Sequence, residues 1–235
     1  MADVLAKNIV FASCDEKYFL EHGEAFIRSA CEHGETPRVH CQHHTPETHR
    51  LAQRLESQFP TSRVIFLNYE DKYKDAHDKR SVYAIGRFIY GKNLLHNNIL
   101  FLDIDSFFRK PVTWEDFRKM DYALFFRESL PGTVGWEKIG TKVAAGAVYV
   151  SHRSRLLSKT MEFINEYPNL PWFVDQVALW KAHEALQFDE HYCQMPAKYI
   201  DWEFKEDSVI WTGKGQRKHS EVYLNEKSSY LSTKT

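Results

Sequence analysis

The stretch Ile99-Leu100-Phe101-Leu102-Asp103-Ile104-Asp105 joins an apolar run to two aspartates that stand two residues apart. A short apolar run of this kind predicts a buried strand. In open α/β sheets, ligands bind beyond the carboxyl ends of the strands, so both aspartates should lie at a crevice. If the chain stays extended, Asp103 and Asp105 point to one side, and Ile104 turns into the core.

Two carboxylates on one side predict a divalent metal site at Asp103 and Asp105. With no cation nearby in the sequence, they would repel each other unless an ion lay between them. Oxygen ligands suit magnesium or manganese. The competing interpretation is a loop in which the aspartates cap the following turn, the usual role of a bare Asp-x-Asp. The buried strand before them favours a metal that bridges a diphosphate.

The rest of the chain alternates predicted strands and helices, which indicates an α/β fold with a mostly parallel sheet. Thr45-Pro46 predicts a helix start, and Ser81 is expected to cap another helix that ends near Gly91. Residues 70–80 and 130–140 are expected to be loops. The other predicted strands cover residues 9–12, 38–41, 63–67, 122–126 and 147–150.

Size and charge narrow the class of protein. The 235 residues predict one domain over 1–235, with a nucleotide-binding part at about 1–107 and a sugar-side part at about 108–235. A formal net charge of -1 gives no reason to expect nucleic-acid binding. Neither a signal peptide nor a transmembrane segment is expected, so we predict a soluble, cytoplasmic protein with reduced cysteines.

Three further segments are candidate parts of a ligand site. Gly213 and Gly215 stand among Lys214, Arg217 and Lys218, a combination that could approach and neutralise a diphosphate or could be an exposed basic turn. Asp175-Gln176 leads into a predicted helix, where the aspartate could instead be a cap. Residues 144–147 are small, which favours either close approach of a ligand or tight packing.

In this order, the segments resemble the GT-A glycosyltransferases of family 8, the group of glycogenin and the bacterial lipopolysaccharide galactosyltransferases. The resemblance runs over most of the chain. The matching positions are Ala12, Cys14, Asp15 and Tyr18 in the nucleoside-binding loop, Arg87 on an arginine-containing helix, Asp103, Ile104 and Asp105 in the metal motif, Gly146 beside the donor sugar, Asp175 and Gln176 as the catalytic pair, and Gly213, Lys214, Gly215 and Lys218 in the diphosphate motif.

The resemblance implies a Rossmann-like, mixed and mostly parallel sheet flanked by helices. It also implies a UDP-sugar donor, Mn2+ or Mg2+, a carbohydrate or other hydroxyl-bearing acceptor, and transfer with retention. The late motif of the family begins with a metal-binding histidine, and this chain has Thr212 at that position. The third protein ligand therefore stays open, with His219 as one alternative.

Two other functions stay open at this stage. A nucleotidyltransferase would share the sheet and the metal carboxylates, but the loop at residues 13–17 is acidic and lacks the glycines expected for such an enzyme. A non-catalytic binding protein could have kept the fold, with Thr212 as a sign of lost turnover. The acceptor is not specified, although Trp136, Trp172 and Trp202 could stack on sugar rings.

Overall fold

The computed structural model describes residues 6–76, 78–127 and 141–231. Within these residues the strands form a seven-stranded, mostly parallel sheet in the order β3-β2-β1-β4-β7-β6-β8, flanked by helices, and β5 pairs with β9 in a separate two-stranded sheet. This confirms the predicted fold class. The chain divides into two compact units, which are described separately.

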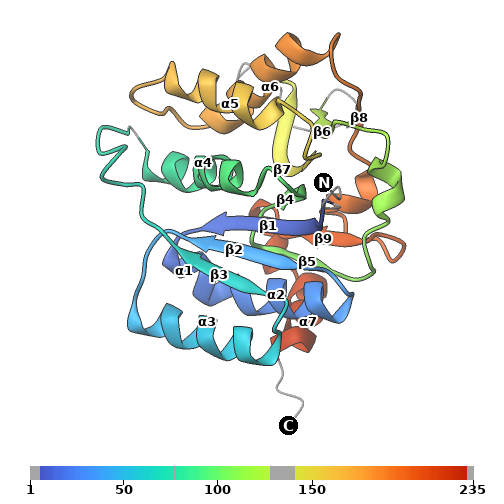
Figure 1. Ribbon diagram of the computed structural model, residues 1–235. Helices are drawn as coiled ribbons and strands as arrows, with labels where there is room; N and C mark the ends of the chain where they lie inside the picture. Colours follow the sequence, from blue (N-terminus) through green and yellow to red (C-terminus); the bar gives the residue numbers. More distant parts are fainter. Residues whose placement is uncertain (1–5, 77, 128–140, 232–235) are drawn as a thin grey trace, which may run out of the picture. The chain divides into compact units, whose positions relative to one another are not determined.

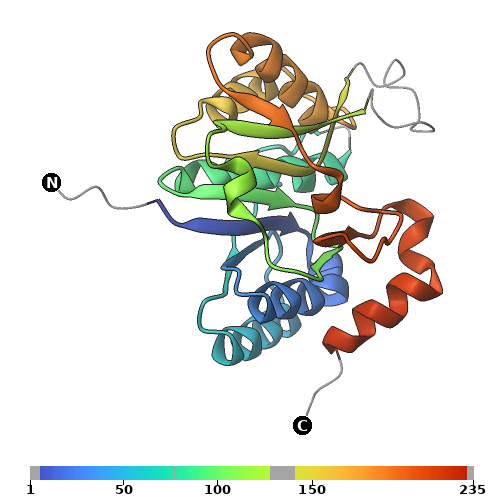
Figure 2. The ribbon, with the colours of Figure 1, turned by 90° about the vertical axis from the view of Figure 1, so that its right-hand side faces the viewer.

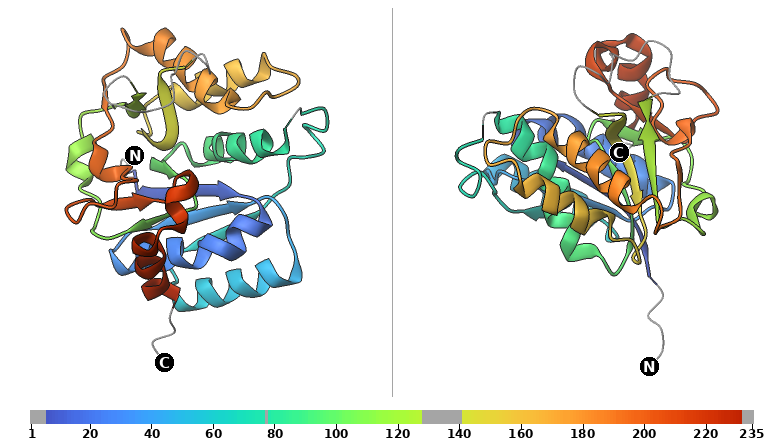
Figure 3. Two further views of the ribbon diagram at one scale, coloured as in Figure 1. Left: turned by 180° about the vertical axis from the view of Figure 1, so that it is seen from behind. Right: turned by 90° about the horizontal axis from the view of Figure 1, so that it is seen from above.

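Unit I consists of Val10–Asn68, Leu102–Thr113 and Pro196–Thr235. The parallel strands β1, β2 and β3 are its centre, and α2 and α3 lie side by side over them (Figure 1). The helix α7 runs beside α2 (Figure 3, left). The elements are β1 (Asn8–Cys14), α1 (Glu16–Tyr18), η1 (Phe19–Gly23), α2 (Glu24–Glu32), β2 (Pro37–Cys41), α3 (Pro46–Gln58), β3 (Arg63–Phe66), β5 (Ser106–Phe108), η6 (Ala197–Tyr199), β9 (Ile210–Thr212), η7 (Gly215–His219) and α7 (Glu221–Leu231).

Local signals explain where the helices of unit I begin and end. Thr45 caps α3 through a reciprocal pair of hydrogen bonds with Thr48, and Pro46 is the first helical residue, as predicted. Beyond α2, Gly34 has a φ of 79°, the left-handed conformation that favours glycine at a helix end. The residues of β1 from Val10 to Ala12 are fully buried, which explains why their apolar run predicts a strand.

Unit II consists of Met1–Ile9, Tyr69–Phe101 and Trp114–Met195. Its helices α5 and α6 pack side by side (Figure 3, right), and β6 pairs antiparallel with β7 and parallel with β8. The elements are α4 (Lys79–Gly91), η2 (Lys92–Leu94), β4 (Asn98–Leu102), η3 (Trp114–Phe117), β6 (Tyr122–Phe126), β7 (Val143–Val150), α5 (Leu156–Asn165), α6 (Val174–Leu186) and β8 (Tyr192–Gln194).

Some predicted boundaries need correction. The predicted cap at Ser81 is wrong: α4 begins at Lys79, because the carboxylate of Asp78 accepts the backbone N–H of Arg80. Ser81 is instead buried inside the helix and donates to the carbonyl of Pro171. The expected loop at 130–140 lies outside the described residues.

The described residues include all four cysteines of the chain. Cys14, Cys31, Cys41 and Cys193 carry free thiols in the structure. Along the described ranges, no helix has both the length and the apolar character needed to cross a membrane.

A buried histidine in unit I should make the folded state sensitive to acid. His40 on β2 is fully buried, its Nε2 donates to the carbonyl of Leu67 at 2.8 Å, and its Nδ1 accepts from the hydroxyl of Ser13 at 2.9 Å. Burial lowers the pKa of His40 to about 4, although the hydrogen bond to Leu67 opposes this shift. The ring is therefore neutral in the folded protein at pH values where the unfolded chain is protonated.

We expect His40 to reduce the free energy of unfolding by about 1.4 kcal/mol per pH unit as the pH falls from about 6.5 to about 4. The sign follows because the unfolded chain binds the proton first. Denaturant titrations across this range measure the slope for His40→Gln, which should be smaller by that amount than the wild-type slope. His96→Gln, at an exposed position, is the control. An unchanged slope for His40→Gln would contradict the prediction.

Candidate active site

The two aspartates of the predicted metal motif lie on a turn directly after β4. The backbone N–H of Ser106 donates to the carbonyl of Asp103 at 3.1 Å and closes this turn. Ile104 is buried, as predicted, but the assumption of an extended chain is wrong. The turn forms because the carbonyl of Asp105 accepts two tertiary hydrogen bonds, from the N–H of Gly213 at 2.9 Å and the hydroxyl of Tyr223 at 2.7 Å.

The late glycine-containing segment is held next to this turn by the small sheet of β5 and β9. Ser106 pairs with Thr212 in the antiparallel register, and their hydroxyl oxygens are 3.1 Å apart. Thr212 is buried, and its hydroxyl contacts Ser106 at the position where the resemblance to family 8 implies a histidine. Figure 2 shows the chain continuing from this strand into η7 and α7.

Lys218 on η7 connects two of the predicted site segments in unit I. Its Nζ donates to the hydroxyl of Tyr18 at 2.8 Å and lies 3.9 Å from Oδ2 of Asp105. Burial opposes the charge of Lys218, but the bond to Tyr18 and the field of Asp105 outweigh burial and raise its pKa. A charged ammonium is therefore stable beside the carboxylate.

Of the predicted nucleoside-binding residues, Asp15 and Tyr18 are partly exposed, whereas Ala12 and Cys14 are buried. Asp15 follows β1 and caps α1, with its Oδ1 accepting the N–H of Tyr18 at 2.8 Å. Ala12 and Cys14 are buried within β1. Burial is the main cause that raises the pKa of the Cys14 thiol, and a hydrogen bond with Cys41 raises it further. This sulfur therefore stays protonated.

The other cations of the late motif lie differently from Lys218. The Nζ of Lys214 lies 4.2 Å from the ring centroid of Trp202, in cation–π contact. Arg217 and His219 are exposed on η7. Gly215 has a φ of 58°, a conformation that favours glycine. Of the three cations predicted to face a diphosphate, Lys218 thus lies beside Asp105, and Lys214 lies beside Trp202.

Gly213 has no room for a side chain. A Cβ built there would lie 2.7 Å from Oη of Tyr223 and 2.8 Å from Cβ of Lys218. Gly213→Ala should displace Tyr223 from Asp105 and cost about 1–3 kcal/mol of stability, typical of overpacking. Chemical denaturation measures this cost, and calorimetry with UDP and manganese measures the effect on binding.

The matched control for this prediction is Gly215→Ala. The left-handed φ makes an alanine there strained, but in the described structure no atom lies within 4 Å of the added Cβ. Gly215→Ala should therefore lose some stability and keep its ligand binding. Equal effects of the two substitutions on ligand binding would contradict the steric role assigned to Gly213.

A second cluster of predicted residues lies in unit II around Arg87. Nη1 of Arg87 on α4 donates to the carbonyl of Ala145 on β7 at 2.9 Å. Its Nη2 lies 3.9 Å from Oδ2 of Asp175 on α6, and both side chains are less than one-tenth exposed. Gly146 follows Ala145 in β7 and is partly exposed. Arg87, Gly146 and Asp175 thus belong to one region of this unit.

Gln176 extends this cluster through a residue that the sequence analysis missed. Its side-chain oxygen accepts from Nη2 of Arg127, and its backbone carbonyl accepts from the Thr141 hydroxyl at 3.0 Å. Burial lowers the pKa of Arg127, and Asp175 opposes the shift. Arg127 directly follows the predicted strand at 122–126, and this position at a strand end is the signal that could have identified it.

The helix that carries Asp175 and Gln176 begins in an unusual way. Phe173 occupies the N-cap position with a φ of 69° and makes no side-chain cap, so the interpretation of Asp175 as a cap is wrong. Asp175 lies in the first turn, where the helix dipole favours a negative charge. Non-glycine residues with positive φ are strained and often occur near functional sites.

The carboxylate oxygens of Asp103 and Asp105 suit a divalent cation, but two side chains do not complete its coordination. Asp103 and Asp105 supply carboxylate oxygens, which hard cations prefer, and Lys218 already places one positive charge beside Asp105. Among the described residues, however, no group of three or more His, Cys, Asp or Glu side chains is close enough together to hold a metal. Ligand oxygens and water would have to complete the coordination.

Solved structures of several glycosyltransferases share this fold. An active-site mutant of LgtC matches with a TM-score of 0.62 and 17% identity, over 95% of this chain and 95% of that one. Apo GlyE of Streptococcus pneumoniae TIGR4 matches with a TM-score of 0.59 and 14% identity, over 96% of this chain and 62% of that one. The apo bifunctional glycosyltransferase WbbM matches with a TM-score of 0.58 and 14% identity, over 83% of this chain and 40% of that one.

At these identities the likeness concerns the fold. The chain spans less than two thirds of WbbM and GlyE but nearly the full length of LgtC. LgtC was also solved as a galactosyltransferase in complex with donor and acceptor sugar analogues. No protein-family model and no curated protein matches the sequence. The chain therefore has the GT-A fold found in the family 8 glycosyltransferases that its motifs resemble.

Proposed function

We propose that this chain is a metal-dependent glycosyltransferase that moves a sugar from a UDP-sugar to a carbohydrate or another hydroxyl-bearing acceptor. One observation carries the proposal: Lys218 joins two segments that are far apart in sequence, Tyr18 after β1 and Asp105 after β4. A cation, the carboxylate of Asp105 and an aromatic side chain meet there. The fold shared with LgtC supports the same assignment.

The carboxylates of Asp103 and Asp105 would hold manganese or magnesium. A cation bound there supplies a Lewis acid that neutralises charge on the departing nucleoside diphosphate. Lys218 adds a second positive charge, and hydrogen bonding to Tyr18 fixes its position. Gly213 allows the backbone to pack closely beside Asp105. We assign the diphosphate to this part of unit I.

The nucleoside is assigned to Asp15 and Tyr18. Oδ1 of Asp15 is used by the cap of α1, so Oδ2 can accept a hydrogen bond from a nucleobase N–H. The partly buried ring of Tyr18 offers an apolar surface beside it. Ala12 and Cys14 are buried in β1, so they would shape the nucleoside site through the packing of this strand.

In unit II, Gln176 is the proposed residue that contacts the reacting sugar. Its side chain is partly exposed, whereas that of Asp175 is buried next to Arg87. We therefore propose that Asp175 is a positioning residue that fixes Arg87 and the start of α6. Arg127 would orient the amide of Gln176 through its hydrogen bond. The transfer is proposed to proceed with retention, as in family 8.

The test is an assay of the purified chain with a panel of UDP-sugars and manganese. Released UDP is measured with and without candidate hydroxyl acceptors, and EDTA provides the metal-free comparison. Metal-dependent release of UDP supports the proposed function. Release of pyrophosphate from UTP and a sugar 1-phosphate would instead identify a nucleotidyltransferase. Metal-dependent binding of UDP without hydrolysis or transfer from any donor would indicate a non-catalytic binding protein.

A further inference from the structure

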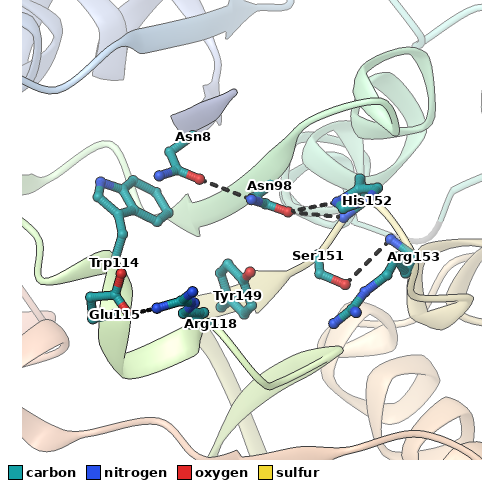
Figure 4. A pocket seen from close by; sticks show the side chains of 9 residues that line it. All are labelled: Asn8, Asn98, Trp114, Glu115, Arg118, Tyr149, Ser151, His152 and Arg153. Carbon is teal, nitrogen blue, oxygen red and sulfur yellow. Dashed lines mark hydrogen bonds and ion pairs between the residues drawn. The ribbon is translucent and has the colours of Figure 1, made fainter. Parts of the chain in front are cut away.

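A separate pocket opens in unit II where β4 begins and β7 ends. It has a volume of about 270 Å³ (Figure 4). Asn98, the first residue of β4, lines it, whereas the other end of β4 leads to Asp103. The pocket also includes neither Arg87 nor Gln176. None of the functions assigned above uses it.

Tyr149 presents its hydroxyl to this pocket. Tyr149 is 3% exposed, and its ring stacks on Phe117 with centroids 4.5 Å apart. Its hydroxyl, which Figure 4 shows among the lining side chains, makes no hydrogen bond to any described residue. Because this hydroxyl faces the pocket and is not used within the described structure, it can bond to a ligand or to an ordered water.

The Tyr149 hydroxyl is a hydrogen-bond donor at ordinary pH. Burial raises the pKa of Tyr149 to about 12, although the nearby guanidinium of Arg153 opposes the shift. The neutral phenol can therefore donate to an acceptor in the pocket.

Two arginines at the pocket have only weak partners. Arg118 pairs with Glu115 at 3.4 Å, and both side chains are about three-quarters exposed. Arg153 lies 3.5 Å from Asp121 and is more than half exposed. Exposed pairs of this kind contribute little, so either guanidinium can turn to a ligand. A guanidinium matches the two oxygens of a carboxylate or phosphate.

The opposite wall adds an oriented amide. Nδ2 of Asn98 donates to Oδ1 of Asn8 at 2.9 Å, and Oδ1 of Asn98 accepts from the backbone and ring of His152 at 3.2 and 3.1 Å. These bonds turn the side-chain oxygen of Asn8 toward Asn98. The Nδ2 hydrogens of Asn8 are therefore available to a ligand. The amide of Asn8 thus adds hydrogen-bond donors to the lining.

The indole of Trp114 supplies an apolar surface in the same pocket. Its ring centroid lies 6.5 Å from that of Tyr149, and Figure 4 shows it on the side of Asn8. Aromatic faces beside hydrogen-bonding groups suit ligands with one apolar face and a polar edge. A sugar ring has this character, whereas an inorganic anion does not.

We propose that this pocket binds an anionic saccharide, a single sugar ring that bears a carboxylate or a phosphate. The arginines would bind the acidic group, Tyr149 and Asn8 would donate to ring or hydroxyl oxygens, and Trp114 would cover the apolar face. The volume is just below the range of pockets for larger ligands, which fits one ring. The proposal does not depend on the transferase assignment.

Calorimetry and spectra of the indole N–H groups in the full chain test this site with four probes: glucuronate, glucose 6-phosphate, glucose and inorganic phosphate. At least one acidic sugar should bind about tenfold more tightly than glucose and inorganic phosphate, and should shift the Trp114 resonance. Binding by glucuronate or by glucose 6-phosphate alone identifies which acidic group the site takes. Added salt should weaken this binding.

Three variants assign the contacts. Arg118→Met or Arg153→Met should weaken binding of the acidic sugar by about tenfold or more, and Tyr149→Phe by about three- to tenfold. Tyr149→Phe keeps the ring that packs on Phe117, so it should fold normally. Arg50→Met, at an exposed position on α3, is the matched control and should bind like the wild type.

Several results would overturn the proposal. These are no binding of either acidic sugar, equal binding of glucose, equal binding of inorganic phosphate, or unchanged affinity in both arginine variants. Equal binding of phosphate would reduce the pocket to a simple anion site. Sugar transfer from UDP donors can succeed or fail independently of each of these results.

Discussion

Replacing Asp105 with alanine is expected to reduce kcat/KM for metal-dependent sugar transfer by about 10³-fold or more, and Asp103→Ala should act similarly. Charge stabilisation by a bound cation is worth several kcal/mol in the transition state, and each 1.36 kcal/mol corresponds to a factor of ten. Each substitution removes one of two carboxylates at a site where the described residues provide no third acidic or histidine ligand. UDP release and manganese-dependent UDP binding measure the loss.

The fold around the turn should survive these substitutions. Gly213 and Tyr223 hold Asp105 through its backbone carbonyl, and Asp105→Ala leaves that carbonyl in place. Lys218 loses its carboxylate neighbour but keeps its bond to Tyr18. Asp105→Asn provides a variant of the same size. A normal melting temperature together with lost activity would assign the effect to the site.

Asp71→Asn is the matched control, because Asp71 is an exposed aspartate in the charged loop before α4. It should transfer sugar like the wild type. If Asp103→Ala and Asp105→Ala keep the wild-type dependence on manganese, neither residue is a metal ligand. If both lose UDP binding equally with and without manganese, their role is in nucleotide binding and the metal assignment fails.

The strands and the order of the site segments could be predicted because their signals are local. Residues 99–102 are apolar and indeed fully buried, and Thr45-Pro46 starts a helix through contacts within one turn. Such signals need no knowledge of the rest of the chain. They identified where Asp103 and Asp105 lie relative to a strand end.

The details that failed depend on residues distant in sequence. The turn at Asp103 to Ser106 is supported by Gly213 and Tyr223, more than a hundred residues further along the chain. The partner of Asp175 is Arg87, on another helix. No local pattern predicts that Tyr223 reaches Asp105 or that Tyr149 faces a pocket. Tertiary hydrogen bonds therefore determine the side-chain geometry that sequence patterns leave open.

Removal of one charge from the buried Arg87 and Asp175 pair should have the largest effect on stability. Asp175→Asn keeps the size of the side chain but leaves the Arg87 guanidinium with less compensation in a site that is less than one-tenth exposed. We expect a cost of about 3 kcal/mol, because breaking a buried pair leaves an uncompensated charge. For a chain of this length, this corresponds to a melting temperature lower by about 6–12 °C.

The exposed pair of Lys181 and Glu166 in the same unit is the matched control. Its atoms are closer, at 3.1 Å against 3.9 Å, but its side chains are 36% and 53% exposed. Solvent screens such a pair, so Glu166→Gln should cost less than about 1 kcal/mol. The longer pair should therefore matter more than the shorter one, because burial outweighs distance.

A double-mutant cycle completes the test of this pair. If the cost of Asp175→Asn comes from the charge left on Arg87, adding Arg87→Met should be less destabilising than the sum of the two single changes, because the uncompensated charge is then gone. Thermal and denaturant unfolding of the four proteins measure the coupling. Additive losses, or an effect of Asp175→Asn no larger than that of Glu166→Gln, would show that the two charges do not interact.

A strong coupling would explain why α6 begins at the strained Phe173. The ion pair would then hold the first turn of α6 in place, and Gln176 with it.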